Sequence, residues 1–306
     1  MPLRPPAGVV APVATPFTAA GEPDAGRFVD HARWLLAEGC TALAPFGTTS
    51  EANSLSIAER KVLLISLLAA GVDPAVLIPG TGLCSAPETV DLTRHAIELG
   101  CAGVLMLPPF YYKGVGDEGV YRHFAQVFER VAENRLRVYL YHIPQLTQVG
   151  FSLPLIERLQ RDFPKLVVGI KDSSGDWTYS KMVIEALPGF QVYSATETML
   201  LDNLRAGGAG CISATANLNA RLMRRIFDAP GGPEADALQR QASAIRKEMQ
   251  SQPLIPATKA MLAHFRQDAS WRHMRAPLEP LLRADSDALA ARLTVAGFRM
   301  DSPAAA

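Results

Sequence analysis

The residue best placed for covalent chemistry in this sequence is Lys171. It ends the apolar run 166–170, and such a run is typical of a strand buried on both faces in a parallel sheet. Burying an ammonium group is costly, so a lysine placed in this way tends to be held as the neutral amine, which attacks carbonyl carbon. On local sequence alone, the alternative is a lysine that leaves the strand and reaches solvent beside Asp172.

Other residues that could bind a substrate or transfer protons lie in or just after other apolar runs of the chain. They are Gly47, Thr48 and Thr49 after the second run, Tyr111 and Tyr112 after the fourth, Tyr141 in the fifth, and Ile212 and Ser213 in the eighth. Taken singly, each has an ordinary structural explanation: a turn for residues 47–49, strand packing for Tyr141, and interface packing for the aromatic cluster at 108–113. Their shared position at the ends of predicted strands makes a common site the stronger interpretation.

Together these residue types suit imine chemistry. Lys171 would attack a ketone, and a tyrosine and a threonine hydroxyl would transfer protons as the carbinolamine forms and loses water. The backbone N–H groups and hydroxyls of residues 47–49 would hold a carboxylate. The six histidines form no HxH or HExxH pattern, so no metal site is expected and a zinc-dependent aldolase is disfavoured. No cofactor is expected beyond the covalent Schiff base itself.

Eight apolar runs, each followed by a helical pattern, position these residues. The runs lie at 9–16, 41–46, 75–79, 102–107, 137–144, 166–171, 190–195 and 210–215. The helices with assignable bounds lie at 24–38, 56–70, 87–99, 118–134, 152–161, 178–187 and 198–205, and Ser56 and Glu59 predict a capping box. This alternation predicts an α/β fold, a (β/α)8 TIM barrel, over residues 1–228. In such a barrel the strand ends meet at one face, which carries the active site.

Residues 229–306 contain helical patterns only, near 234–250, 255–265 and 285–296. They predict a C-terminal helical appendage packed on the outer ring of the barrel. Residues 302–306 are expected to be frayed.

Composition narrows the class of protein further. Lys+Arg and Asp+Glu both total 30 in 306 residues, so the net charge is zero, and neither a nucleic acid nor a membrane surface is an expected partner. No apolar run approaches the length of a membrane span, and residues 1–6 lack the apolar stretch of a signal peptide. Four cysteines outside any CxxC pair are typical of reduced thiols, so a cytoplasmic location is expected.

The chain resembles the dihydrodipicolinate synthase / N-acetylneuraminate lyase family of class I, Schiff-base aldolases. The resemblance covers essentially the whole chain and rests on motifs at residues 13–17, 47–51, 80–82, 109–112, 141–144, 169–172 and 212–217. It implies Lys171 as the Schiff-base lysine, Tyr141 as the proton-transferring phenol and Thr48 as a relay hydroxyl. It also implies that Thr48 and Thr49 bind the carboxylate of pyruvate or another 2-oxo acid, and that the backbone of Ile212 faces the substrate.

The resemblance further implies a homotetramer, built as a dimer of tight dimers. In this family a neighbouring subunit lends a tyrosine to the active site. Tyr111 matches that tyrosine, with Tyr112 as the alternative.

Departures from the family pattern bear on the substrate. Dihydrodipicolinate synthases carry an arginine where this chain has Leu146, and leucine cannot bind the carboxylate of an aldehyde substrate. The lyases carry an acidic pair where only Glu197 is present, and Ser50 replaces the usual glycine, which argues against a bulky sialic acid. A smaller hydroxylated 2-oxo acid is therefore expected, with contacts from Ser173, Glu197, Thr198 and Ser213.

The sequence therefore predicts a pyruvate-type Schiff-base lyase, aldolase or dehydratase. Two alternatives remain at this point: a 4-hydroxy-tetrahydrodipicolinate synthase that condenses pyruvate with aspartate semialdehyde, and a non-catalytic sensor of 2-oxo acids.

Overall fold

A curled sheet of seven parallel strands forms the centre of the protein, in a computed structural model that describes residues 7–300. The strand order is β2-β1-β7-β6-β5-β4-β3, so only β2 and β3 lie at the edges. The strands are β1 (Gly8–Ala11), β2 (Ala42–Leu43), β3 (Val104–Met106), β4 (Val138–His142), β5 (Val167–Asp172), β6 (Gln191–Ser194) and β7 (Gly210–Ile212). The expectations about a signal peptide and a frayed C-terminus concern residues 1–6 and 302–306, which lie outside the described part of the chain.

The third predicted strand, at 75–79, is not a regular strand. Residues Pro74–Val76 form the 3-10 helix η3, and only single bridges follow, from Leu77 to Leu43 and from Gly80 to Leu105. Proline has no N–H to donate to a strand ladder, and Pro74 and Pro79 flank this short segment. The segment nevertheless lies between the two edge strands, since the N–H of Ile78 donates to Leu43 O and the N–H of Leu105 donates to Pro79 O.

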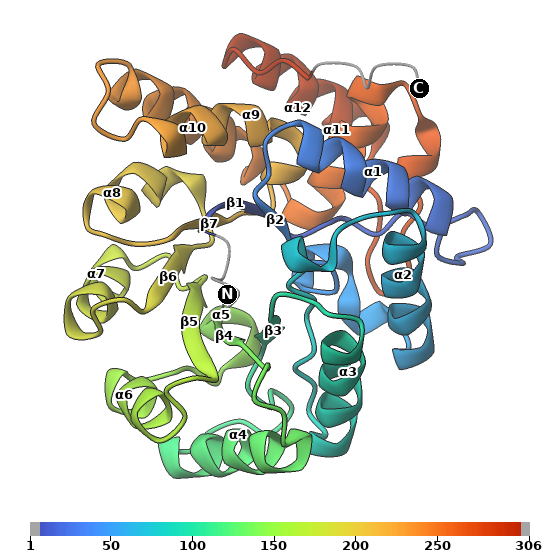
Figure 1. Ribbon diagram of the computed structural model, residues 1–306. Helices are drawn as coiled ribbons and strands as arrows, with labels where there is room; N and C mark the ends of the chain where they lie inside the picture. The colour runs from blue at the N-terminus through green and yellow to red at the C-terminus, as the bar shows by residue number, and fades with distance from the viewer. Residues whose placement is uncertain (1–6, 301–306) are drawn as a thin grey trace.

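Helices surround the strands on the outside (Figure 1). The helices that follow the strands in turn are α1 (Ala25–Ala37), α2 (Ile57–Ala69), α3 (Ala86–Glu98), α4 (Asp117–Val131), α6 (Leu153–Asp162), α7 (Trp177–Ala186), α8 (Leu200–Arg205) and α9 (Ala216–Asp228). Seven of these agree with the predicted helices to within a few residues, whereas α9 and the short α5 (Pro144–Thr147) were given no bounds from sequence. No helix of residues 7–300 is long and apolar enough to cross a membrane.

Side chains of successive strand residues alternate between two cores. Val138 and Leu140 of β4 belong to the core between sheet and helices, together with Ile170 of β5. Tyr139 and Tyr141 belong to a separate cluster inside the curled sheet. The same alternation, with a period of two, directs Lys171 into the interior.

The C-terminal helices are α10 (Ala235–Met249), α11 (Leu254–Arg266) and α12 (Arg283–Val295), which gather beside α9 (Figure 1). They share a third core, and Ala14 and Leu218 from the preceding part of the chain belong to it as well. This region is therefore packed against the loop after β1 and against α9.

A second contact joins the C-terminal region to α2. Ser56 and Glu59 form the predicted capping box, and the guanidinium of Arg275 binds both carboxylate oxygens of Glu59, with Nη1–Oε2 at 2.9 Å. These bonds, with Arg275 as the largest cause, lower the pKa of Glu59 from 4.5 to about 2. A carboxylate with a lowered folded-state pKa stabilises the fold above pH 4.5, and this stabilisation is lost as the pH falls toward 2.

Glu59→Gln should therefore lower the free energy of unfolding at pH 7 by about 1 to 2 kcal/mol, since the pair is partly solvated. The difference from the unmodified protein should shrink as the pH is lowered from 5 toward 2, as measured by urea unfolding at each pH. Glu157→Gln, on the exposed face of α6, is the matched control and should have little effect. A deficit for Glu59→Gln that stays constant over this range would contradict the assigned pKa shift.

Candidate active site

Lys171 lies near the carboxyl end of β5 and is only 3% exposed. Its register partners are Tyr141 on β4 and Tyr193 on β6. The Nζ atom lies 4.3 Å from the centroid of the Tyr141 ring. The side chain is therefore buried inside the sheet and does not run out to solvent beside Asp172.

Gly169 allows this strand to lie close to its neighbours. A Cβ at this position would meet the carbonyl oxygen of Gln191 at 2.4 Å and the Tyr139 ring at 2.8 Å. Both distances are too short for any side chain to fit without a shift of backbone. The glycine two residues before Lys171 thus helps to fix the position of the lysine between β4 and β6.

Tyr141 joins Lys171 to the loop after β2. Its phenol hydroxyl donates a hydrogen bond to Thr48 Oγ1 at 3.1 Å. Thr48 begins the 3-10 helix η1 (Thr48–Ser50), and Thr49 is buried beside it. The structure therefore brings together Lys171, Tyr141 and Thr48, which lie up to 123 positions apart in the chain. Lys171 and Tyr141 are buried, and Thr48 is partly exposed.

The Gly80-Thr81-Gly82 motif packs directly under this loop. A Cβ on Gly80 would lie 2.1 Å from the carbonyl oxygen of Phe46, and a Cβ on Gly82 would lie 2.2 Å from the N atom of Leu107. A small pocket lies between these segments, and Gly47, Thr48 and Tyr141 contribute to its lining. The first N–H groups of a helix have no partner within the helix, so η1 presents donors suited to a carboxylate.

Asp172 and His142 point to the other side of the strands. The Asp172 carboxylate accepts hydrogen bonds from Ser174 N at 2.8 Å and Ser180 Oγ at 2.6 Å. His142 stacks on Tyr179, and its Nδ1 accepts from Phe151 N at 3.1 Å. Burial lowers the pKa of His142, although nearby Asp172 opposes the shift. These two groups serve structure and are not placed to act on Lys171.

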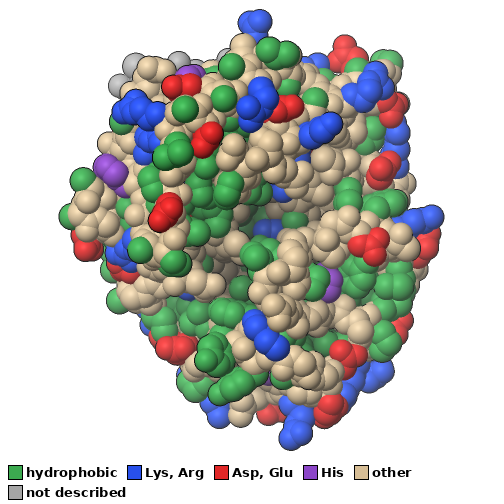
Figure 2. Space-filling model, turned by 180° about the vertical axis from the view of Figure 1, so that it is seen from behind, with side chains coloured by type: hydrophobic (Ala, Val, Ile, Leu, Met, Phe, Trp, Pro, Cys, Tyr) green, Lys and Arg blue, Asp and Glu red, His purple; other side chains and the backbone are tan. Residues whose placement is uncertain are grey.

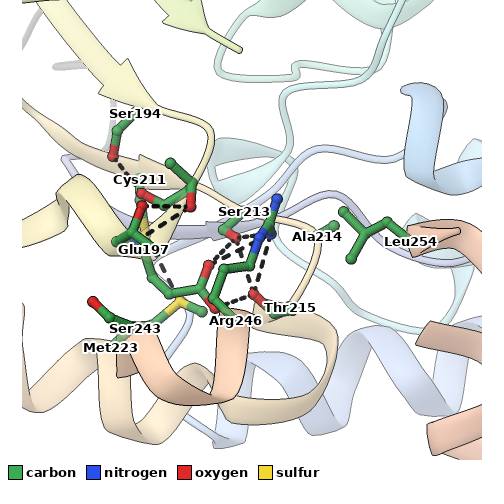
Figure 3. A network of polar contacts seen from close by, with 12 residues as sticks. Ser194, Glu197, Cys211, Ser213, Ala214, Thr215, Met223, Ser243, Arg246 and Leu254 are labelled. Atoms are coloured by element: carbon green, nitrogen blue, oxygen red, sulfur yellow. Dashed lines mark hydrogen bonds and ion pairs between the residues drawn. The ribbon is translucent and has the colours of Figure 1, made fainter. Parts of the chain in front are cut away.

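Glu197 and Ser213 are fully buried and lie together. Glu197 accepts from Ser213 Oγ at 2.6 Å and from Thr215 Oγ1, and its carboxylate has no exposed surface. Arg246 reaches this group from α10, with Nη1 3.1 Å from Ser213 Oγ and 3.5 Å from Glu197 Oε2 (Figure 3). The carboxylate is thus held in a network that fixes the segment after β7.

Arg246 was not identified from the sequence. It occupies a helix with charged residues on both sides, and only its position on the buried face of α10, beside Ile245 and Met249, distinguishes it.

Burial and the nearby Glu197 carboxylate raise the pKa of the Cys211 thiol, which fits an unreactive cysteine in this core.

Tyr111 and Tyr112 lie outside the group formed by Lys171, Tyr141 and Thr48. They are 73% and 74% exposed, and their rings meet edge to face with centroids 5.4 Å apart. Lys113 anchors this loop through a bond from Nζ to Thr147 O at 3.0 Å. Within a single chain, therefore, neither tyrosine joins Lys171, Tyr141 and Thr48.

Leu146, Ser173 and Ile212 occupy different surroundings. Leu146 is 59% exposed on α5, and its neighbour Gln145 donates from Nε2 to Ser173 O at 2.5 Å. Ser173 in turn donates its N–H to His142 O at 2.7 Å. Ile212 is buried in the cluster inside the sheet that also contains Tyr141.

The face behind the view of Figure 1 is hollowed near its middle, and Lys or Arg surface is visible within the hollow (Figure 2). Within residues 7–300, no group of three or more His, Cys, Asp or Glu residues is arranged to hold a metal ion.

The site thus contains a buried lysine at a strand end, next to a bonded tyrosine–threonine pair. Comparison with known proteins shows the family to which a chain with this site belongs. Residues 5–296 match the model of the dihydrodipicolinate synthetase family. An uncharacterized DapA-like lyase from Chloroflexus aurantiacus is 33% identical over 288 residues, which cover 94% of this chain and 95% of that protein.

Solved structures agree with this relationship. Dihydrodipicolinate synthase from Agrobacterium tumefaciens strain C58 superposes with a TM-score of 0.88 at 30% identity, covering 94% of this chain and 98% of that one. A prophage protein of the dihydrodipicolinic acid synthase family from Escherichia coli K12, in complex with pyruvate, has a TM-score of 0.87 at 26% identity, with 96% and 99% covered.

The chain belongs to the dihydrodipicolinate synthetase family. It is therefore an enzyme of a lyase and aldolase family.

The Glu197 network gives a stability prediction. Arg246→Met should lower the free energy of unfolding by about 3 kcal/mol, because the buried Glu197 carboxylate loses the cation with which it pairs. The matched control is Arg205→Met, which breaks the exposed Arg205–Asp236 pair and should cost less than about 1 kcal/mol. Equal losses for the two variants in chemical unfolding would show that the network does not depend on Arg246.

Proposed function

We propose that this enzyme forms an imine between Lys171 and the ketone of pyruvate or a small hydroxylated 2-oxo acid, and acts as a lyase, aldolase or dehydratase. The observation that carries the proposal is the buried Nζ of Lys171 at 4.3 Å from the Tyr141 ring, with the Tyr141 hydroxyl bonded to Thr48. The pyruvate complex of the Escherichia coli relative supports the same class of substrate.

In the proposed reaction, the Lys171 amine adds to the ketone carbon to give a carbinolamine. Tyr141, backed by Thr48, transfers the proton that lets the hydroxyl leave as water, and an iminium remains. The substrate carboxylate binds at Gly47, Thr48 and Thr49. The iminium then accepts the electron pair of an adjacent C–C or C–H bond, and reversal of the first steps releases the product.

Beyond its ketone and carboxylate, the proposed substrate carries a small group with hydroxyls. Leu146 offers no cation for a second carboxylate. Ser173 and Thr198 are the proposed contacts for hydroxyl groups. Glu197 and Ser213 are fully buried and bonded to one another, so their proposed role is to position the segments after β6 and β7 beside the substrate.

A second candidate is 4-hydroxy-tetrahydrodipicolinate synthesis from pyruvate and aspartate semialdehyde. It is favoured by the similarity to the Agrobacterium synthase and disfavoured by Leu146.

The proposal includes an assembly and a full barrel. The exposed Tyr111 or Tyr112 would enter the site of a neighbouring subunit in a homotetramer built as a dimer of dimers. Residues 77–80 would serve as the eighth strand of a closed (β/α)8 barrel ending near residue 228, followed by the helical region 229–306. A cytoplasmic location is supported by the four cysteines, all of them free.

Cyanoborohydride treatment in the presence of pyruvate should add one reduced pyruvyl group to the peptide that contains Lys171. Intact-protein and peptide mass spectrometry measure this adduct. Lys171→Ala should give no adduct and no turnover. Unmodified Lys171 after treatment would end the proposal, and a Lys171→Ala variant with its full biological effect would favour the 2-oxo-acid sensor instead.

Tyr141→Phe should slow exchange of the pyruvate methyl protons with D2O by roughly 100-fold or more, because imine and enamine formation lose their proton carrier. Proton NMR follows this exchange without knowledge of the second substrate. Tyr121→Phe is the matched control, since it removes a phenol hydroxyl that is bonded to Asp162 at the outer helices. Equal exchange rates for the two variants would remove Tyr141 from the mechanism.

Turnover with 2-keto-3-deoxy acids, or with pyruvate and simple hydroxyaldehydes, should exceed turnover with pyruvate and aspartate semialdehyde. A coupled assay across these pairs measures the ranking. Strong turnover with aspartate semialdehyde would establish the second candidate and show that Leu146 does not prevent it.

A further inference from the structure

Lys259 is a fully buried lysine that the proposed reaction does not use. It lies on α11, and its side chain is 1% exposed. Its Nζ contacts Glu51 Oε1 at 2.5 Å, donates to Thr15 O at 2.9 Å and lies 4.6 Å from the centre of the Phe17 ring. The Glu51 carboxylate is completely buried as well, so neither charged group is solvated by bulk water.

Glu51 belongs to the loop proposed to bind the substrate carboxylate. It directly follows η1, and its backbone is left-handed, with φ at 55°. Its N–H donates to Thr48 O at 3.0 Å. A non-glycine residue in this conformation is strained and persists only where its surroundings hold it. Here the surroundings include the hydrogen bond that Lys259 donates to the Glu51 carboxylate.

Thr15 provides a second connection from Lys259 to the same loop. The hydroxyl of Thr15 donates to Ser50 O at 2.7 Å, while its carbonyl oxygen accepts from Lys259. The ammonium group therefore holds η1 through two routes, the Glu51 carboxylate and the Thr15 backbone. The carboxylate has one further weak contact, from Arg275 N to Oε2 at 3.4 Å.

Burial opposes charge on both partners, since it raises the pKa of Glu51 and lowers the pKa of Lys259, while each partner's charge counteracts the effect on the other. Replacing a buried ion pair by apolar side chains of similar size is often neutral for stability or stabilising. If the pair served stability alone, replacing both residues by apolar side chains should leave the protein intact in stability and function. If the pair sets the geometry of the loop, the same replacement should impair function even where stability is kept.

We infer that Lys259 and Glu51 are positioning residues that hold the Gly47–Thr49 segment in the form that binds the substrate carboxylate and places Thr48 beside Tyr141. This inference rests on the proposed function. It assigns α11, a helix of the C-terminal region, a part in substrate binding, although neither Lys259 nor Glu51 touches the reacting atoms.

Three variants of the full chain test the inference: Lys259→Met, the double variant Glu51→Met/Lys259→Met, and Arg205→Met as the control. The control breaks the exposed pair with Asp236 on α10, which lies far from η1 in the chain. For each, the rate of cyanoborohydride trapping on Lys171 is measured against pyruvate concentration at a temperature where the protein is folded. Thermal unfolding is measured in parallel.

Lys259→Met should lower the unfolding temperature and raise the half-saturating pyruvate concentration at least 10-fold. In the double variant Glu51→Met/Lys259→Met, the unfolding temperature should return most of the way to that of the unmodified protein. The half-saturating pyruvate concentration should nevertheless stay at least 10-fold above that of the unmodified protein. Arg205→Met should match the unmodified protein in both measurements. If Lys259→Met does not fold, the double variant alone decides the question.

A double variant that regains both its unfolding temperature and its pyruvate affinity would overturn the inference and leave the pair a structural role only. An unchanged affinity in Lys259→Met would overturn it as well. No trapping by the unmodified protein is a different result, because it removes the proposed function itself.

Discussion

Burial of the Lys171 amine inside the sheet is the constraint on which the site depends. The lysine lies one residue after an outward-facing isoleucine, beside the Tyr141 ring and with almost no access to solvent. In this position the amine, a nucleophile suited to carbonyl carbon, is held next to the tyrosine that is proposed to transfer its protons. Gly169 makes this position possible, because any side chain there would strike β6 and Tyr139.

The segments around Lys171 are held from outside the strands. Gly80 lets its own segment lie close to the loop after β2, and Gly82 lets it lie close to the loop after β3. Lys259 and Arg275 bring the C-terminal region against Glu51 and Glu59. The region beyond residue 228 therefore shares a core with Ala14 and Leu218, and it forms ion pairs with Glu51, Glu59 and Glu197 of the preceding part of the chain. The division at residue 228 stays a prediction from the change in sequence pattern.

Much of this architecture follows from sequence periodicity. The alternation of apolar runs and helices predicts the parallel strands, and the residues at their ends predict the meeting of Lys171, Tyr141 and Thr48. The 75–79 segment shows where the reasoning stops: its composition suits a strand, but its prolines leave it with single bridges. Arg246 and Lys259 were missed because helix patterns do not tell which charged residue faces a buried partner. A lone lysine within the largely apolar stretch 254–263 was the available signal for Lys259.

The central claim is that Lys171 forms a covalent bond to a 2-oxo acid whose carboxylate lies on residues 47–49. A crystal structure of the protein soaked with pyruvate tests this most directly. The account predicts continuous electron density from Lys171 Nζ to the pyruvyl C2, with the carboxylate against Thr48 and Thr49. Pyruvate bound without a covalent link to Lys171, or with its carboxylate held elsewhere, would contradict it.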